Sequence, residues 1–193
     1  MAEPSKPFNR ATLHQAFERL GHMAIQASKV VDISIYGGSA LVLTTDFRIA
    51  TRDVDAVFEQ DRSFIRRAAG TVAAEFGWNE NWINDGVKGF LSTQDAEAKS
   101  KLLLHSYPSE EHPGLRVFVA SPSYLFAMKC LAMRLGGTEQ NEDIADIRNL
   151  GTLLGIKTAK QAIAAISRYY PAERLPPKTG FGLEEIFGAA QDD

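Results

Sequence analysis

The segment 35–57, IYGGSALVLTTDFRIATRDVDAV, constrains the fold more than any other part of the chain. The β-branched run before it, VVDISIY at 30–36, ends at two glycines, which predicts a buried strand that enters a tight turn. The short apolar stretch 39–44 predicts a helix whose N-terminus lies at that turn. DVDAVF at 53–58 alternates polar and apolar residues, which predicts a second strand. The predicted order is strand, glycine turn, helix, strand.

Two carboxylates open the second of these strands. Asp53 and Asp55 are two residues apart, so on a strand both side chains project from the same face. Neighbouring carboxylates repel each other unless a cation lies between them or one of them binds a proton. Mg²⁺ binds proteins through one or two carboxylates together with phosphate oxygens of the substrate. We therefore predict that Asp53 and Asp55 bind Mg²⁺ or Mn²⁺ and act in catalysis.

The glycine turn has the features of a phosphate site. Gly37 and Gly38 allow a ligand to approach the backbone closely, and the N–H groups at the start of the following helix can bind a phosphate. Ser39 adds a hydroxyl at the same edge. We therefore predict that Gly37, Gly38 and Ser39 bind the phosphates of a nucleotide, opposite the metal-binding pair.

The rest of the chain predicts an α/β N-terminal part and a helical C-terminal part. Apolar residues at helical spacing indicate helices over 11–28 and 62–76, and short apolar runs indicate strands at 101–105 and 115–119. Together with the strands predicted at 30–36 and 53–58, they predict a small mixed sheet of about four strands. We therefore divide the chain into an α/β core, 1–120, and a helical subdomain, 121–193. The helices expected in the subdomain cover about 122–135, 138–153, 158–169 and 183–187, the last of them following chain breaks at Pro171, Pro176 and Pro177.

Composition narrows the function classes. Within 193 residues the net charge is −3, which argues against the broad basic face that sequence-independent nucleic-acid binding requires. A nucleotide or an RNA end, held through metal ions and a few local bases, remains compatible with this charge. The single cysteine, Cys130, excludes an internal disulfide and a cysteine-rich zinc site, and fits a reducing cytoplasm. We find no apolar stretch that is long enough to span a membrane, and expect a cytoplasmic protein.

The glycine turn and the two aspartates of segment 35–57 resemble the motif of the nucleotidyltransferase superfamily that includes DNA polymerase beta. Its signature is a G-[GS] turn followed by a D-x-[DE] strand, here Gly38-Ser39 and Asp53-x-Asp55, with Thr51 two residues before the first aspartate. The runs RIATRDVDAV, WINDGVKGF, SPSYLFAMKCLAMRL and EDIADIRNL are similar to the AbiE-type toxin branch of bacterial toxin-antitoxin systems. The resemblance spans about residues 33–154.

The resemblance implies further site residues. Lys129 matches a lysine in the helix after the last strand, which implies binding to the nucleotide phosphates. Asp143 and Asp146 match acidic residues of the next helix, one of which assists the acceptor. As i and i+3 on a helix they are neighbours on one face, and the alternative for this pair is an ion pair with one of the two nearby arginines. Those arginines are Arg134 and Arg148. Among the other basic residues, Arg52 and Arg48 flank the aspartates, where they either bind the triphosphate or lie in solvent; we count Arg52, with Thr51, among the nucleotide-binding residues.

The implied function is transfer of a nucleoside monophosphate from an NTP to an acceptor hydroxyl. The branch implies a toxin that acts on RNA, at the 3′ end of tRNA, and that has a cognate antitoxin protein. One alternative is an antitoxin-type enzyme that adenylylates a protein, although that branch has an arginine soon after the turn, where this chain has Ala40, Leu41 and Val42. The other is a catalytically degenerate nucleotide-binding or interaction module. Two departures bear on it: the strands LLLH and LRVFV carry no third carboxylate, and Glu142 stands where the branch often has lysine.

Overall fold

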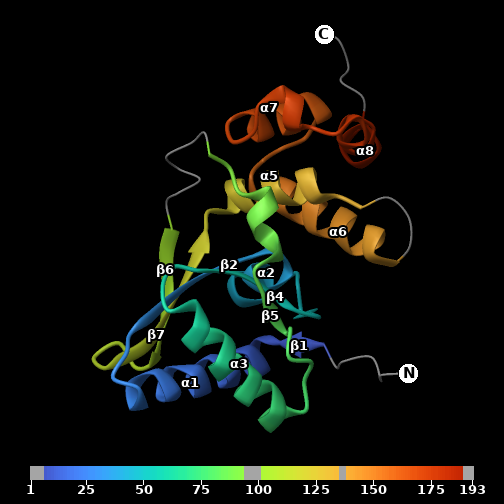
Figure 1. Ribbon diagram of the computed structural model, residues 1–193. Coiled ribbons are helices and arrows are strands. Elements are labelled where there is room, and N and C mark those ends of the chain that lie inside the picture. Colours follow the sequence, from blue (N-terminus) through green and yellow to red (C-terminus); the bar gives the residue numbers. More distant parts are fainter. Residues whose placement is uncertain (1–6, 94–100, 135–137, 189–193) are drawn as a thin grey trace. The chain divides into compact units, whose positions relative to one another are not determined.

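The computed structural model describes residues 7–93, 101–134 and 138–188 (Figure 1). The chain divides into two compact units, the first made of Met1–Gly89 and Lys101–Ala120, the second of Phe90–Ser100 and Ser121–Asp193. Within the described residues no helix is both long enough and apolar enough to cross a bilayer. The two units are described in turn.

The first unit is built on a mixed sheet with the strand order β5-β4-β2-β7-β6. The central strand β2 pairs with β4 in antiparallel and with β7 in parallel orientation, while β5 is parallel to β4 and β6 antiparallel to β7. A second, two-residue pairing joins β1 to β3. The strands are β1 (Phe8–Asn9), β2 (Val31–Tyr36), β3 (Ala50–Thr51), β4 (Val54–Phe58), β5 (Ile83–Asn84), β6 (Lys101–Pro108) and β7 (Pro113–Ala120).

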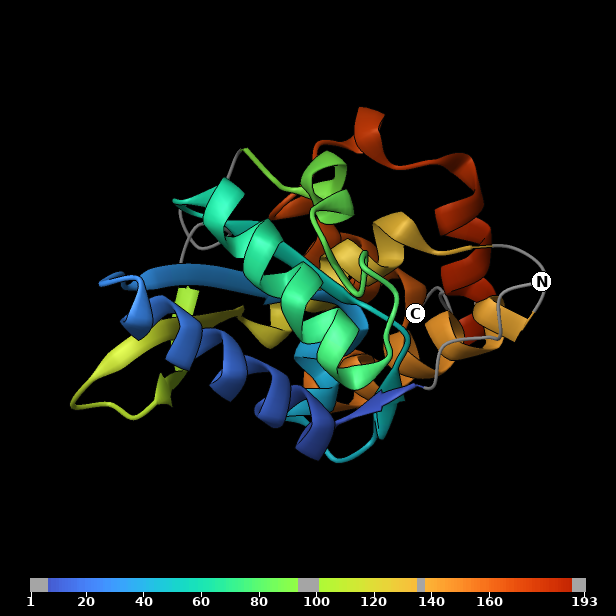
Figure 2. The same ribbon diagram turned by 60° about the horizontal axis from the view of Figure 1, so that its bottom comes forward.

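Helices α1 (Arg10–Gln26) and α3 (Arg62–Phe76) lie side by side on one side of this sheet, as Figure 1 and Figure 2 show together. The apolar stripe of α1 is buried, and its Phe17 ring lies 5.7 Å from the Tyr107 ring of β6. The alternate residues of β4 that face this layer, among them Val54 and Ala56, are fully buried. Residues between them, such as Asp55, project to the opposite face.

The short helix α2 (Gly37–Thr44) is attached to α1 by one side chain. Arg10 donates from Nε to the Val42 carbonyl at 2.9 Å and from Nη2 to the Thr45 carbonyl at 2.6 Å. The last carbonyls of a helix have no partner within the helix, so these bonds satisfy groups that the helix alone leaves open. The guanidinium thus connects the first turn of α1 to the end of α2.

The second unit is helical. It contains α5 (Pro122–Ala132), α6 (Thr138–Leu153), α7 (Ala159–Ser167) and α8 (Pro177–Phe187), with α5 in contact with the other three. Residues of the preceding segment belong to this unit, because the Ser92 backbone N–H donates to the Tyr124 hydroxyl at 2.7 Å and the Tyr170 hydroxyl donates to the Phe90 carbonyl at 2.5 Å. The unit is therefore held by a buried tyrosine cluster as well as by its aliphatic residues.

The α/β class, the mixed sheet and the flanking helices are confirmed, with differences at the edges. The sequence analysis misses β5, the 3-10 helix η1 (Gly86–Phe90) and the β1–β3 pair, all too short to show a periodicity. Helix α8 begins at Pro177 rather than near 183, because proline at the first helical position needs no N–H partner. The expected stop of the preceding helix at Gly136 and Gly137 lies outside the described residues.

Candidate functional site

The glycine turn connects the central strand directly to α2. Strand β2 ends at Tyr36 and α2 begins at Gly37, whose φ of +59° lies in the left-handed region. A side chain in this region is strained, so the backbone conformation favours glycine. Because β2 is paired on both sides, the position of the turn is set by the sheet.

Asp55 lies against this turn. It is the register partner of Tyr36 across the antiparallel β2–β4 pair. An ideal Cβ built on Gly37 would lie 2.6 Å from Asp55 Oδ2, closer than real Cβ atoms approach another heavy atom. The φ angle therefore favours glycine at 37, and any side chain there would also have to displace the Asp55 carboxylate. Asp55 and the glycine turn thus lie side by side in the structure, as the sequence analysis expects.

Asp53 is exposed and directly precedes β4. It lies two residues before Asp55, the spacing at which side chains of an extended segment share a face. Its main-chain carbonyl accepts a hydrogen bond from Thr51 Oγ1 at 3.1 Å, which ties the start of β4 to the end of β3. Arg52, between these two residues, is exposed.

Gly38 brings two further side chains to the turn. An ideal Cβ on Gly38 would lie 2.8 Å from Thr51 Oγ1 and 3.6 Å from Arg48 Nη2. Arg48 Nε donates to the Ala50 carbonyl at 2.8 Å, which holds the guanidinium next to the glycines. Arg48, for which the sequence left open the choice between triphosphate and solvent, thus lies beside the predicted phosphate site.

Ser39 is placed differently from its neighbours. Its side chain is buried, with 1% of the residue exposed, and Oγ donates to the Tyr36 carbonyl at 2.9 Å. This bond closes the first turn of α2 onto the last residue of β2. The serine hydroxyl is therefore bonded within the turn itself.

Asn84, in the run WINDGVKGF, is a residue whose position relative to the site the sequence alone leaves open. In the parallel β4–β5 pair Asn84 is the register partner of Asp55, so the two residues lie on the same face of neighbouring strands. Asn84 Oδ1 accepts a hydrogen bond from the Gly86 backbone N–H at 2.8 Å, which orients the side-chain amide. A strand of two residues has no detectable pattern, and only its pairing with β4 identifies this position.

Lys129, Asp143 and Asp146 come together in the second unit. Lys129 Nζ lies 3.2 Å from Asp143 Oδ1 and 2.8 Å from Asp146 Oδ2, and all three side chains are at most 14% exposed. Arg134 adds a bond from its Nε to Asp143 Oδ2 at 2.9 Å. Burial raises the pKa of Asp143, but the hydrogen bond from Arg134 and the charge of Lys129 outweigh it, so the net pKa is lowered. Of the two arginines named as alternative partners, Arg134 is the one that pairs with Asp143.

The residues at the turn fit a divalent cation only as a partial ligand set. Among the described residues, no group of three or more His, Cys, Asp or Glu side chains is arranged to hold a metal ion. Asp53 and Asp55 supply two carboxylates, and Mg²⁺ characteristically completes such a set with water and substrate phosphate oxygens. The donor set therefore fits a metal that arrives with a nucleotide.

The chain was compared with protein families, with curated proteins and with solved structures. No protein-family profile matches the sequence, and no curated protein matches it significantly. Among solved structures, the chain is similar to an antigenic nucleotidyltransferase-like protein from Paracoccidioides brasiliensis, with 16% sequence identity, a TM-score of 0.45, and coverage of 93% of this chain and 95% of that chain. At that identity and TM-score we base no argument on the likeness. The chain is thus characterised here by its own mixed α/β fold and by the residues gathered at its glycine turn.

Proposed function

We propose that the protein is a nucleotidyltransferase that transfers a nucleoside monophosphate from an NTP to an acceptor hydroxyl. The observation that carries the proposal is the contact between the Asp55 carboxylate and the left-handed Gly37, with Oδ2 2.6 Å from the Cβ position of the glycine. A carboxylate beside an open backbone turn juxtaposes a metal ligand and a phosphate cradle. Nucleotidyl transfer depends on positioning the phosphates and on neutralising their charge, and this arrangement can supply both.

Each residue at the turn has a role in this proposal. The backbone N–H groups of Gly37 and Gly38 bind the β- and γ-phosphates at the start of α2. Arg48, beside Gly38, neutralises their charge. Asp53 and Asp55 would hold Mg²⁺, which supplies charge stabilisation for the attacking and leaving oxygens.

The bond changes define what the chain must do. The acceptor oxygen forms a bond to the α-phosphorus, the bond from that phosphorus to the β-phosphate oxygen breaks, and pyrophosphate leaves with the electron pair. The hydroxyl proton passes to water. Since this chemistry depends mainly on positioning and on charge neutralisation, a turn held by a doubly paired strand is a suitable platform.

The acceptor and the biological role extend the same proposal. We propose an RNA acceptor, the 3′ end of tRNA, and a toxin whose activity a cognate antitoxin restrains. The support is the similarity of four sequence runs to the AbiE-type branch. Lys129 is proposed to bind phosphate through the same resemblance, although in the structure its ammonium group is paired with Asp143 and Asp146.

A second candidate function is nucleotide binding without turnover. The observation that favours it is strand β7, whose residues PGLRVFVA carry no carboxylate beside the central strand. With the β2 and β4 edge supplying only Asp53 and Asp55, a third acidic ligand is missing from the position where the superfamily usually has one. The adenylylation of a protein acceptor remains the third alternative.

One experiment separates these functions. The purified protein is incubated with each α-labelled NTP and Mg²⁺, in parallel with total RNA and with a protein lysate. Label in RNA supports the proposal, label in protein supports adenylylation, and NTP binding without transfer supports the binding module. Asp55→Ala should reduce transfer about 10²- to 10³-fold while the fold is retained.

The control for this substitution is Asp46→Ala. The Asp46 side chain is 99% exposed, in an ion pair with Arg10 at the end of α2, and lies outside the proposed metal pair. The control should transfer at the wild-type rate. Transfer by Asp55→Ala at the wild-type rate would contradict the assignment of the metal pair.

A further inference from the structure

A pocket of about 260 Å³ lies at the β5 edge of the first unit, apart from the glycine turn. Its apolar lining comes from the end of β4, from β5 and from the middle of α3. Phe58, Ile83, Ala69 and Gly70 provide it. An ideal Cβ on Gly70 would meet no atom within 4 Å, so the helix presents an open, side-chain-free surface there. Gly70 thus leaves room for a ligand group against α3.

The rim of the pocket is polar and carries both donors and acceptors. It contains two amides, Asn81 and Asn84, and three charged side chains, Arg66, Glu80 and Asp85. Arg66 lies 3.4 Å from Asp85, so the two opposite charges partly balance each other. The Lys88 ammonium group also pairs with Asp85, so the rim holds charges of both signs close together. The edge of a nucleobase, which presents donors and acceptors together, matches such a mixed rim.

The size of the pocket fits one ring system. Sites for drug-sized ligands occupy about 300–1,000 Å³, so this pocket is slightly smaller than a site for a complete nucleotide. A base would enter it while the sugar and phosphates stay outside. The polar atoms at the rim would then select the base by hydrogen bonds to its edge.

Asn84 links the pocket to the site at the turn. It lines the pocket and is also the register partner of Asp55 on the neighbouring strand. Neighbouring strands lie about 4.8 Å apart, a separation of the size of a ribose. Asn84 is therefore the residue that the pocket and the neighbourhood of Asp55 share.

We propose that the pocket between α3 and β5 binds the nucleobase of a substrate nucleotide. The inference rests on the proposed function for the direction in which the nucleotide lies. Asn84 and Asn81 bind the edge of the base, and α3 packs against its plane at Gly70. The base belongs either to the incoming NTP or to the terminal nucleotide of the acceptor, and the experiment below separates the two.

Trp82 provides a reporter that needs no activity. Its indole N–H donates to the carbonyl of Ala69, a pocket residue, at 3.0 Å. In the ¹⁵N-labelled full-length protein, this indole signal is followed by NMR during titration with adenosine, guanosine, cytidine and uridine, without divalent metal. The expected result is a saturable shift with at least one nucleoside. No shift with any of the four would overturn the proposal.

Matched variants test where the nucleoside binds. Gly70→Leu fills the pocket and should abolish the shift, whereas Gly70→Ala adds one methyl group into open space and should retain it. Asn81→Ala should weaken binding by roughly tenfold or more, since an amide pair to a base edge contributes about 1–3 kcal/mol. Unchanged binding by Gly70→Leu would show that the nucleoside binds elsewhere and would overturn the proposal.

Two further measurements show whether the base comes from the NTP or from the acceptor, and they test the base pocket separately from the proposed function. Displacement of the bound nucleoside by an NTP assigns the pocket to the incoming nucleotide, and displacement by a short RNA with a free 3′ end assigns it to the acceptor; displacement by neither would overturn the proposal. Asp55→Ala should bind the nucleoside normally. If the protein binds a nucleoside but transfers no NMP, the base pocket is supported and the proposed function is wrong. If Gly70→Leu transfers NMP as the wild type does, the proposed function is supported and the base pocket is wrong.

Discussion

Asp55 Oδ2 occupies the space beside Gly37 that a methyl group at position 37 would need, at 2.6 Å from the ideal Cβ position. Strand β4, which carries Asp55, thus packs closely against the turn that follows β2. This relationship can be tested at the glycine as well as at the acid.

Gly37→Ala should reduce both stability and NMP transfer. A left-handed conformation costs a non-glycine residue about 1–2 kcal/mol, and the new methyl group must also displace the Asp55 carboxylate. Gly77→Ala is the matched control, because Gly77 has φ +69° and an ideal Cβ there meets no atom within 4 Å. Chemical denaturation and the transfer assay should show a similar backbone cost in both variants and lost transfer only in Gly37→Ala. Equal activity of the two would refute the role of the contact.

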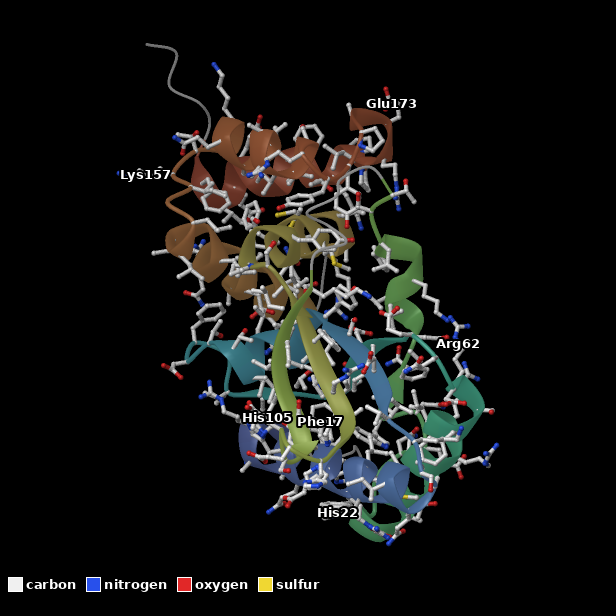
Figure 3. The ribbon with its side chains drawn as sticks, turned by 90° about the vertical axis from the view of Figure 1, so that its left-hand side faces the viewer. Phe17, His22, Arg62, His105, Lys157 and Glu173 are labelled. Carbon is white, nitrogen blue, oxygen red and sulfur yellow. The ribbon has the colours of Figure 1, made fainter. Side chains whose placement is uncertain are left out.

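Lys129→Met should lower the free energy of unfolding by at most about 3–5 kcal/mol, because it removes a cation that faces two buried carboxylates, while Asp143 keeps its bonds to Arg134. The exposed Lys157, labelled in Figure 3, provides the control Lys157→Met, which should unfold as the wild type does. Denaturant titrations measure both. If Lys129→Met unfolds normally but binds NTP weakly, the lysine acts on the ligand, as the sequence resemblance implies, rather than on the fold.

Asp143→Asn should reduce the loss of stability in acid. In the folded protein burial raises the pKa of Asp143, but Arg134 and Lys129 lower it by more, so the net pKa is below that of the unfolded chain. Its stabilising contribution is therefore complete above the unfolded carboxyl pKa of about 3.9 and is lost as the pH falls through the lowered value. Stability measured from about pH 6 to pH 3 should fall less steeply in Asp143→Asn than in Asp46→Asn. Identical slopes would contradict the role of this carboxyl.

His14→Gln should make stability less dependent on pH near neutrality. The Tyr107 hydroxyl lies 2.6 Å from His14 Nδ1, and burial, followed by the charges of His105 and Arg10, lowers the pKa of the imidazole. The unfolded chain therefore binds a proton more readily, and stability falls as the pH drops below about 6.5. Figure 3 labels His105 and the exposed His22. The free energy of unfolding, measured between about pH 7 and pH 5, should change less with pH in His14→Gln than in the wild type, and the control His22→Gln should behave as the wild type does.

Much of the fold follows from local pattern. The strand, turn, helix and strand around Gly37 are all present, because β-branched runs, paired glycines and alternating polarity act over a few residues. Strand β5 lacks such a pattern, since its two residues become a strand only through pairing with Val54 and Asp55. Asn84 therefore lies next to the acid for a reason that no local sequence signal contains.

The site is less predictable than the fold, because side-chain partners depend on long-range packing. The proximity of Asp55 to Gly37 follows from the antiparallel register of β2 and β4. In contrast, the serine of the motif turns its hydroxyl to Tyr36, and Lys129 pairs with two carboxylates fourteen or more positions further along the chain. Spacing alone indicates that Asp143 and Asp146 share a face, but not which cation lies on it.

The two bonds from Arg10 to the end of α2 have a consequence for how the chain can be shortened. The Val42 and Thr45 carbonyls are anchored by a residue that precedes them by more than thirty positions, at the first residue of α1. A truncation that removes residues 1–10 would keep every residue of the glycine turn but would remove both bonds that hold the end of α2. The shortest fragment that keeps this site intact thus begins before the motif does, and a shorter engineered version would need another donor for these two carbonyls.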